Sequence, residues 1–238
     1  MSFPVDSQLW SHNQILFALS RQQYPLLFSN LEVVQLPRGK VVFHLAEPIK
    51  KVLFVASGMV SLLATTEDGS TTQVAMIGNE GLIGIPAVLG ISKAPYQVTI
   101  QIPGRAMAVK AEILVEAFRQ PGPLQDILLR YLHSLISQIS QSAACNRFHT
   151  VEERLCRWLL VSCDRAKSNN LPLTQETLSY MLGAPRTNVT KAATALKRAG
   201  LIKYQRGDIQ ILNRLGLEQR GCECYRVISE HLGAFRAA

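Results

Sequence analysis

Five polar side chains cluster in one short segment near the C-terminus. They are Arg186, Thr187, Asn188, Thr190 and Lys191. An arginine can donate two hydrogen bonds to guanine and an asparagine can pair with adenine. Threonine contacts bases or a thymine methyl group, and lysine offers a positive charge to a base or a phosphate. The segment therefore carries the chemistry needed to read the edges of base pairs.

The surrounding residues predict two helices that would position this cluster. Pro185 opens one helix, which runs to Arg198, and Gly200 lies just past its end. Its inward face is expected to consist of Val189, Ala192, Ala193 and Leu196. The preceding helix covers residues 174–182 and ends at the turn Gly183-Ala184. Its start holds Thr174 as the N-cap and Gln175, and both could meet phosphate.

A hairpin follows the second helix. Residues 201–204 and 209–212 alternate like strands around a tight turn at 205–208. Two helices joined by a glycine turn and followed by a hairpin predict a winged helix-turn-helix, whose second helix enters the major groove. The alternative is that the polar cluster forms only the solvated face of an ordinary helix.

The charge distribution favours a polyanionic partner for the C-terminal part. The chain carries a net charge of +8. From Val151 onward it has 14 Lys and Arg against 8 Asp and Glu, whereas residues 1–150 have 11 against 9. A basic excess confined to one domain is typical of nucleic-acid binding, although charge alone does not establish it.

The N-terminal half is rich in short β-branched or alternating segments. Turn-forming residues such as Pro37-Arg-Gly39 and Glu67-Asp-Gly69 separate them. Many strands at this spacing predict a barrel or jelly roll. We expect strands at residues 33–36, 41–45, 52–55, 60–63, 71–76, 97–100 and 106–109.

A long helix is predicted after Pro121-Gly-Pro123. Apolar residues there recur at steps of three and four, which is the period of one helix face. The stripe consists of Leu124, Leu128, Leu132, Leu135, Ile139 and Ala143. A domain surface or a twin helix could cover this stripe, and we favour a twin helix from a second copy. The expected dimer contacts are Leu128, Leu132, Leu135 and Ile139.

The predicted organisation has three parts. Thr150-Val-Glu-Glu153 matches a capping box, so a new helix is expected from Val151 towards Asp164. The boundaries are then residues 1–123 for the β-rich domain, 124–149 for the dimerisation helix and 150–238 for the winged helix-turn-helix domain. The fold class is α+β.

Neither catalysis nor metal binding is predicted. No Ser-His-Asp set or phosphate loop is present, and His44, Glu47 and Glu80 are scattered. The five cysteines all lie between residues 145 and 224, and their odd number favours reduced thiols over a disulfide framework. Cys222-Glu-Cys224 has no nearby CxxC or histidine pair to complete a zinc set.

We expect a cytoplasmic protein. No apolar run approaches the roughly 18 residues that a membrane helix needs. The first residues also lack the basic segment and apolar stretch of a signal peptide.

The chain resembles the Crp/Fnr family of bacterial transcription regulators from about Leu31 to Tyr225. The run from Leu173 to Lys191 resembles the family's DNA-binding motif, and Gly78-Asn-Glu-Gly-Leu-Ile-Gly84 resembles its cyclic-nucleotide cassette. The resemblance makes residues 1–123 a cyclic-nucleotide-binding-like sensor domain. It also places the family's base-reading arginine, glutamate and second arginine on Arg186, Thr187 and Lys191. Thr187 cannot accept a hydrogen bond from the cytosine amino group as a carboxylate does, so the operator should differ at that base pair.

The resemblance weakens at the effector pocket. cAMP-binding members hold the ribose with a glutamate after the cassette glycine and the phosphate with an Arg-Ser pair. Here Ile85 and Pro86 follow Gly84, and Pro95-Tyr96-Gln97 occupies the Arg-Ser position. Lys93 is the nearest cation in the sequence. We therefore expect weak or no cAMP binding.

Two residues of the long helix are further candidate effector contacts, namely Gln138 and Ser140. No cofactor is predicted. An iron-sulfur member would need cysteines near the N-terminus, and a haem member would need more sensor ligands than the single His44.

The predicted function is that of a homodimeric regulator that binds double-stranded DNA at a palindromic operator. Its candidate partners are RNA polymerase and a small-molecule effector, and no membrane partner is expected. Two alternatives stay open. The regulator could act without an effector, or the helix-turn-helix could be a docking surface of a regulatory subunit.

Overall fold

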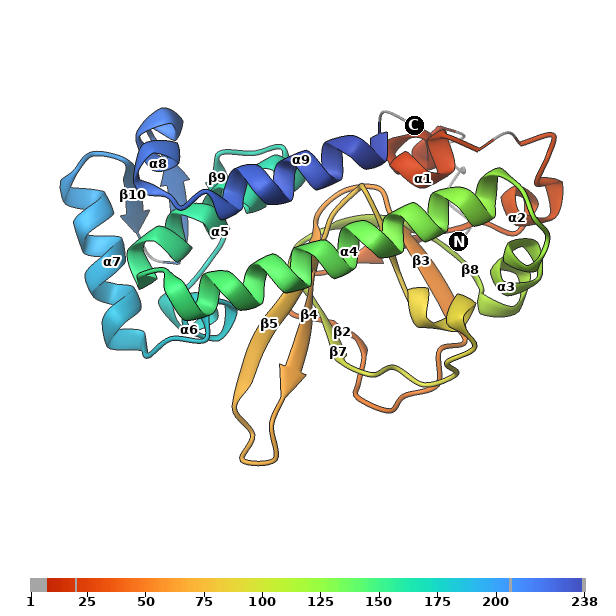
Figure 1. Ribbon diagram of the computed structural model, residues 1–238, viewed down its shortest axis with the longest axis horizontal. Helices are drawn as coiled ribbons and strands as arrows, with labels where there is room; N and C mark the ends of the chain where they lie inside the picture. Colours follow the sequence, from red (N-terminus) through yellow and green to blue (C-terminus); the bar gives the residue numbers. More distant parts are fainter. Residues whose placement is uncertain (1–7, 20, 206, 237–238) are drawn as a thin grey trace. The chain divides into compact units, whose positions relative to one another are not determined.

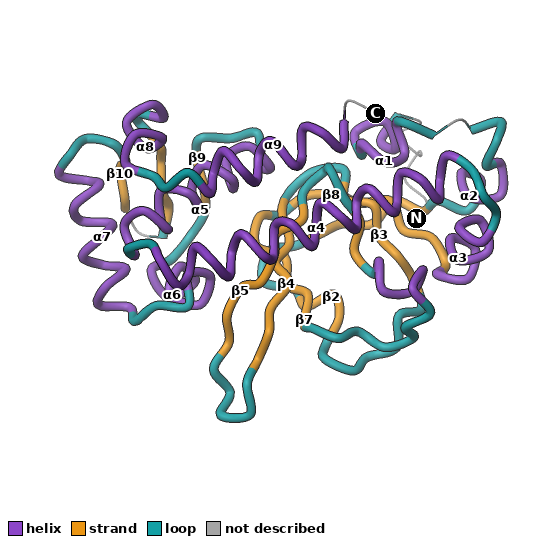
Figure 2. The backbone as a smooth tube through the Cα atoms, viewed as in Figure 1, coloured by secondary structure: helices purple, strands orange, loops and turns teal. Residues whose placement is uncertain are grey.

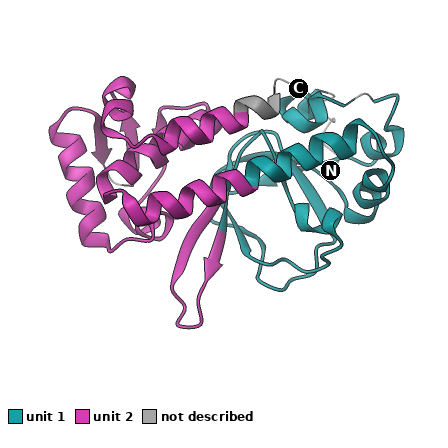
Figure 3. Cartoon of the chain, viewed as in Figure 1, with its two compact units in different colours: residues 1–62, 76–135, 235–238 teal, residues 63–75, 136–234 magenta. Residues whose placement is uncertain are grey.

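The protein is described by a computed structural model that covers residues 8–19, 21–205 and 207–236, with side chains described up to residue 232 (Figure 1). The chain divides into two compact units, one of residues 1–62, 76–135 and 235–238 and the other of residues 63–75 and 136–234 (Figure 3). The domain boundaries expected at 123/124 and 149/150 stay predictions. The turn expected at 205–208 contains Arg206, which lies outside the described residues.

Two four-stranded sheets form the β-rich part of the chain. The first has the order β1-β8-β3-β6 and the second the order β2-β7-β4-β5. The strands of the first sheet are β1 Glu32–Leu36, β8 Gly104–Lys110, β3 Lys51–Val55 and β6 Leu82–Ile83. Those of the second sheet are β2 Val41–Phe43, β7 Gln97–Ile102, β4 Met59–Thr65 and β5 Thr71–Ile77. Every predicted strand is present, and the two-residue strand β6 was not predicted.

The β-rich part of the chain also contains short helices that the sequence analysis did not predict. They are η1 Leu9–His12, α1 Gln14–Phe17, α2 Pro25–Ser29, η2 Ile85–Leu89 and α3 Ala111–Arg119 (Figure 2). Asn13 joins the first of them to the β-sheet. Its fully buried amide donates hydrogen bonds to the carbonyl oxygens of Val55 at 2.9 Å and Gly81 at 2.8 Å. Its oxygen accepts from the backbone N–H of Ile15 and Leu16, so the side chain also caps α1.

The long predicted helix is α4, Pro123–Phe148. Its apolar residues occupy two faces rather than one stripe. Leu128 is 0% exposed and Leu135 is 7% exposed within the single chain, whereas Leu129 is 49% and Ile136 is 61% exposed. The structure therefore corrects the expected dimer stripe, because Leu128 and Leu135 already belong to the protomer's interior. Leu132 and Ile139 are partly exposed.

The second unit is built mainly from helices. Its elements are α5 Val151–Ala166, β9 Asn170–Leu171, α6 Gln175–Leu182, α7 Arg186–Arg198, β10 Ile202–Gln205, β11 Asp208–Ile211, α8 Arg214–Arg220 and α9 Cys224–Arg236. The capping box at the start of α5 is confirmed. The backbone N–H of Glu153 donates to Thr150 Oγ1 at 3.3 Å, and the backbone N–H of Thr150 donates to Glu153 Oε2 at 2.7 Å.

The outer end of the β4–β5 hairpin, residues 63–75, belongs to this second unit. Trp158 of α5 is fully buried, and its Nε1 donates a 2.7 Å hydrogen bond to Gln73 Oε1. Hydrogen bonds between buried polar groups are costly to break, because a lost partner leaves a desolvated group unpaired. Strand β5 of the hairpin is thereby fixed to α5 at Gln73.

No helix among the described residues has both the length and the apolarity to cross a lipid bilayer.

Candidate nucleic-acid interface

Helix α6 is held at both ends by local backbone chemistry. Thr174 is the N-cap, as predicted, and its Oγ1 accepts a 3.1 Å hydrogen bond from the backbone N–H of Thr177. Gly183 ends the helix with a left-handed φ of +52°, a conformation that L side chains rarely adopt. A side chain there would also strike Thr72, because a Cβ atom would lie 2.7 Å from its Oγ1. The predicted glycine turn is present.

Helix α7 separates its apolar and polar residues as predicted. Pro185 is its N-cap, and the buried residues are Val189, Ala192, Ala193 and Leu196. Arg186, Thr187, Asn188 and Lys191 are exposed. We call these four residues the exposed row of α7. Two cations, one amide and one hydroxyl group are thus available to a ligand along one helix.

Thr190 differs from the rest of the predicted cluster. It is partly buried, and its hydroxyl oxygen lies 2.9 Å from both Gln175 Oε1 and the backbone carbonyl of Arg186, which share its single proton as acceptors. Gln175 is partly buried as well. This pair connects the first turn of α6 with the second turn of α7. Both residues therefore fix the angle between the two helices in the structure.

The predicted wing is present and has a third strand. β10 and β11 pair antiparallel from Ile202 opposite Ile211 to Gln205 opposite Asp208. β9 pairs with β11 on its other side, although the sequence analysis interpreted residues 169–172 as a polar connector. Two residues are too few to show an alternating pattern, so the sequence gives no signal for this strand.

Tyr204 of the wing is a site residue that the sequence analysis missed. Burial raises the pKa of its phenol, and a backbone hydrogen bond from Gln175 and the charge of Arg186 oppose that shift. Tyr204 therefore lies beside the starts of α6 and α7. The sequence feature that could have indicated Tyr204 is an aromatic residue in the strand that directly follows the second helix.

The predicted effector residues are found in several environments. Gly84 has a φ of +92° and precedes η2, whose first residues Ile85 and Pro86 are buried. Tyr96 and Gln97 are partly exposed, and the Gln97 amide donates to Thr99 Oγ1 at 3.1 Å. Burial raises the pKa of Tyr96 to about 12, so its hydroxyl stays protonated.

The other candidate effector residues differ in how far they are exposed. Lys93 is exposed and pairs through its backbone with Pro48 in an isolated bridge. On α4, Gln138 is buried and Ser140 is exposed. The carboxylate of Glu47 accepts a hydrogen bond from the backbone N–H of His44, so these two residues are joined within one turn.

A winged helix-turn-helix next to a β-rich domain defines a class of DNA-binding transcription regulators. Two family models match the chain. The cyclic nucleotide-binding domain covers residues 33–120, and the Crp-like helix-turn-helix domain covers residues 153–220. The protein belongs to the Crp/Fnr family of transcription regulators. Its members are not enzymes, and the family supports DNA binding over a protein-docking surface.

Characterised relatives agree with this assignment. The chain is 23% identical to the global nitrogen regulator of Synechococcus elongatus over 80% of this chain and 90% of that protein. It is 24% identical to the CRP-like cAMP-activated global transcriptional regulator of Mycobacterium tuberculosis over 82% of this chain and 90% of that protein.

Solved structures show the same fold. A Crp/Fnr-family regulator from Eubacterium rectale superposes with a TM-score of 0.70 at 18% identity, covering 88% of this chain and 98% of that chain. FixK2 from Bradyrhizobium japonicum gives a TM-score of 0.69 at 17% identity, covering 81% of this chain and 98% of that chain.

The Thr190–Gln175 hydrogen bond leads to a prediction that differs from base reading. Thr190→Val keeps the shape of the side chain but removes the hydroxyl that links the two helices. We expect a loss of about 0.5–1.5 kcal/mol in DNA affinity that is similar for all sequences, because helix placement changes and no base contact is lost. Fluorescence anisotropy with the operator and with single-base variants measures this. A changed preference at a single base pair would instead make Thr190 a base-reading residue.

Proposed function

We propose that the protein is a homodimeric regulator that reads a palindromic operator with the exposed row of α7 and is controlled by an effector other than cAMP. The observation that carries this proposal is the exposed row itself. Arg186, Asn188 and Lys191 project from a helix whose opposite face is buried apolar surface. A helix with this arrangement can enter a major groove without unfolding any part of its own core.

The exposed row suggests which bases are read. Arg186 suits guanine, Asn188 suits adenine, and Lys191 suits a guanine or a phosphate. Thr187 can contact a thymine methyl group but cannot replace a carboxylate acceptor. Thr174 and Gln175 at the start of α6 are proposed to meet the phosphate backbone, where helix N-termini favour negative charge.

The exposed apolar face of α4 supports a dimer. Leu129 and Ile136 are 49% and 61% exposed, and Leu132 and Ile139 are partly exposed on the same helix. These positions follow steps of three and four, which is the spacing that packs one helix against its twin. A two-fold symmetric dimer then presents two copies of α7 to successive major grooves, roughly 34 Å apart.

The environment of Ile85 argues against cAMP as the effector. The residues that follow the cassette glycine are buried and apolar, and burial keeps the Tyr96 hydroxyl neutral. A cyclic phosphate would need a charged partner, because an unpaired charge is costly to bury. The Arg-Ser pair of cAMP-binding members is replaced here by Tyr96 and Gln97.

The β4–β5 hairpin offers a route from the sensor to the DNA-binding elements. Part of each strand belongs to the first unit, and β5 is joined to α5 by the bond between Gln73 and Trp158. We propose that the effector favours one of two packings of the sensor and that the hairpin and α4 re-aim the α7 helices. RNA polymerase is a further proposed partner that rests on the family alone.

Substitution of Arg186 tests the readout. Arg186→Ala should cost about 1–3 kcal/mol in operator affinity and relax the preference at one base pair in each half-site. The matched control is Arg226→Ala, because Arg226 is also an exposed arginine of the second unit, with 69% of its side chain accessible. Binding to a panel of single-base operator variants separates the two. An equal loss on every sequence would make Arg186 a phosphate contact.

Titration with cAMP tests the proposed effector class. We expect calorimetry to detect no binding and operator affinity to stay the same when cAMP is added, because Tyr96 and Gln97 stand where cAMP-binding members hold the phosphate with an Arg-Ser pair. A true effector should change operator affinity by about 5–150-fold. A cAMP-induced increase in that range would refute the proposal. An operator affinity that no cell extract changes would favour an effector-independent regulator.

A further inference from the structure

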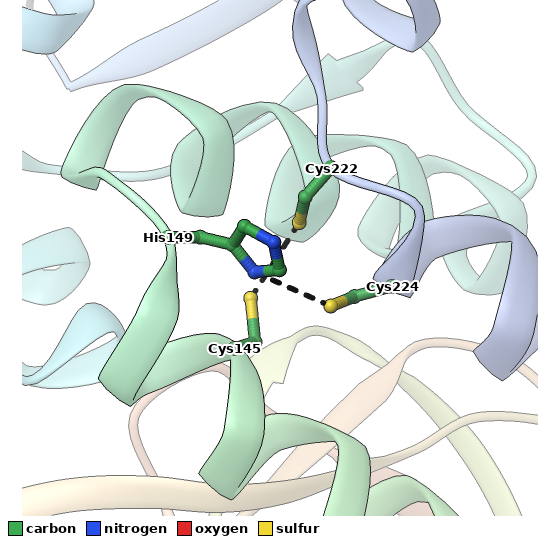
Figure 4. Close-up of side chains that lie close together, drawn as sticks. All are labelled: Cys145, His149, Cys222 and Cys224. Atoms are coloured by element: carbon green, nitrogen blue, oxygen red, sulfur yellow. Dashed lines mark hydrogen bonds between the residues drawn. The ribbon is translucent and has the colours of Figure 1, made fainter.

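Three thiols and one imidazole meet at the end of α4 in the second unit. Cys145 lies in the last turn of α4, and His149 follows it by four residues. Cys222 and Cys224 lie in the segment between α8 and α9 and at the start of α9. Their ligand atoms all lie within 4.8 Å of one another (Figure 4). We call this group the Cys3His cluster.

The structure brings two further candidate metal ligands to the Cys222-Glu-Cys224 pair. No metal site was predicted because no further ligands lie near Cys222 in the sequence. Here Cys145 and His149 complete a four-ligand set from a segment more than seventy residues away. That reason for excluding a metal therefore fails.

We propose that the Cys3His cluster binds one Zn²⁺ ion and that this ion fastens α9 to the end of α4. Three cysteines and one histidine form a common structural zinc set, in which all four ligands come from the protein and no position is left open for a substrate. Soft thiolate ligands together with an imidazole favour zinc over the hard cations Mg²⁺ and Ca²⁺. The proposal goes beyond operator reading, since no step of DNA recognition requires it.

The distances fit a tetrahedral ion. Zn–S bonds of about 2.3 Å and Zn–N bonds of about 2.0–2.1 Å would separate the ligand atoms by roughly 3.5–3.8 Å. The Sγ atoms of Cys145 and Cys222 are 3.6 Å apart, and Cys224 Sγ lies 3.5 Å from His149 Nδ1. Two opposite edges of the tetrahedron are therefore already in place. The 3.6 Å separation is also far longer than the roughly 2.05 Å of a disulfide bond.

The groups around the cluster match the usual outer shell of a zinc site. His149 directs Nδ1 towards Cys224 and Nε2 towards the carboxylate of Glu223, at 3.3 Å. A carboxylate on the far nitrogen orients a metal-bound histidine. The amide of Gln141 donates a 3.0 Å hydrogen bond to Cys224 Sγ. Such a bond stabilises a thiolate.

The charge of the surroundings also fits. Three thiolates around Zn²⁺ carry a net charge of −1, and the buried Arg157, 5% exposed, lies close enough to balance it. A buried guanidinium beside the thiols would offset the negative charge that a metal–thiolate centre carries.

Metal analysis of the full chain tests the proposal directly. The protein is purified without an affinity tag or chelator under reducing conditions and analysed by inductively coupled plasma mass spectrometry. We expect one zinc per chain. Protein stripped of zinc and reloaded with Co²⁺ should show the absorption bands of tetrahedral cobalt–thiolate coordination. Chains without stoichiometric metal, chains with iron in its place, or a Cys145–Cys222 disulfide in metal-free protein would overturn the proposal.

Substitutions locate the ion on these residues. Cys222→Ser should lose the zinc, whereas Cys163→Ser, the matched control at a buried thiol outside the cluster, should keep it. Glu223→Gln should weaken zinc affinity by about 10–100-fold in a chelator competition, because it removes the carboxylate that orients His149. Its control is Glu230→Gln, another exposed glutamate that forms an ion pair. Both glutamate side chains are more than half exposed, so the fold should not depend on them. Zinc retained by Cys222→Ser would place the ion elsewhere.

Discussion

The exposed row of α7, which we propose reads DNA, depends on how closely α7 packs against its neighbours. Ala192 and Ala193 place small side chains on the buried face of α7, which contacts α5, α6 and β10. Small side chains on this face let α7 pack closely against its neighbours. The opposite face stays exposed. Burying a single Val or Leu contributes about 1.5–3 kcal/mol, while an exposed ion pair contributes about 0–1 kcal/mol. The apolar face thus holds α7 in place and leaves its charges available for a ligand.

Local chemistry made the DNA-binding elements predictable. The caps of Thr150 and Thr174, the left-handed Gly183 and the inward residues of α7 each depend on neighbours a few positions away. Such signals are legible in a single sequence because the residues that interact are adjacent in the chain. The strands of the sensor were predictable for the same reason.

Features that depend on distant contacts could not be predicted in the same way. Leu and Ile occupy both faces of α4, so periodicity alone did not separate buried Leu128 from exposed Leu129. Thr190 was predicted to read bases because it is polar and lies on the outward side of its helix. Nothing in the sequence indicated its bond to Gln175, because that bond joins two different helices. The Cys3His cluster had one local clue, since Cys145 in the last turn of α4 and His149 just past its end are four residues apart, the spacing that brings side chains together on a helix.

The two parts of this protein differ in how far they follow the family pattern. The DNA-binding part retains the polar helix with a change at Thr187, while the sensor has apolar Ile85 and Pro86 after the cassette glycine. A sensor can change its ligand while the DNA-reading geometry stays constant, because the two sites are formed by different side chains.

Selection from a pool of random duplexes is the most direct measurement of whether α7 reads DNA. The wild-type full chain is incubated with the pool at low ionic strength, with and without cell extract as a source of effector, and the bound duplexes are sequenced. The account predicts enrichment of a two-fold symmetric site whose half-site centres lie about 10–10.5 base pairs apart. If no sequence is enriched either with or without cell extract, the result would contradict the account.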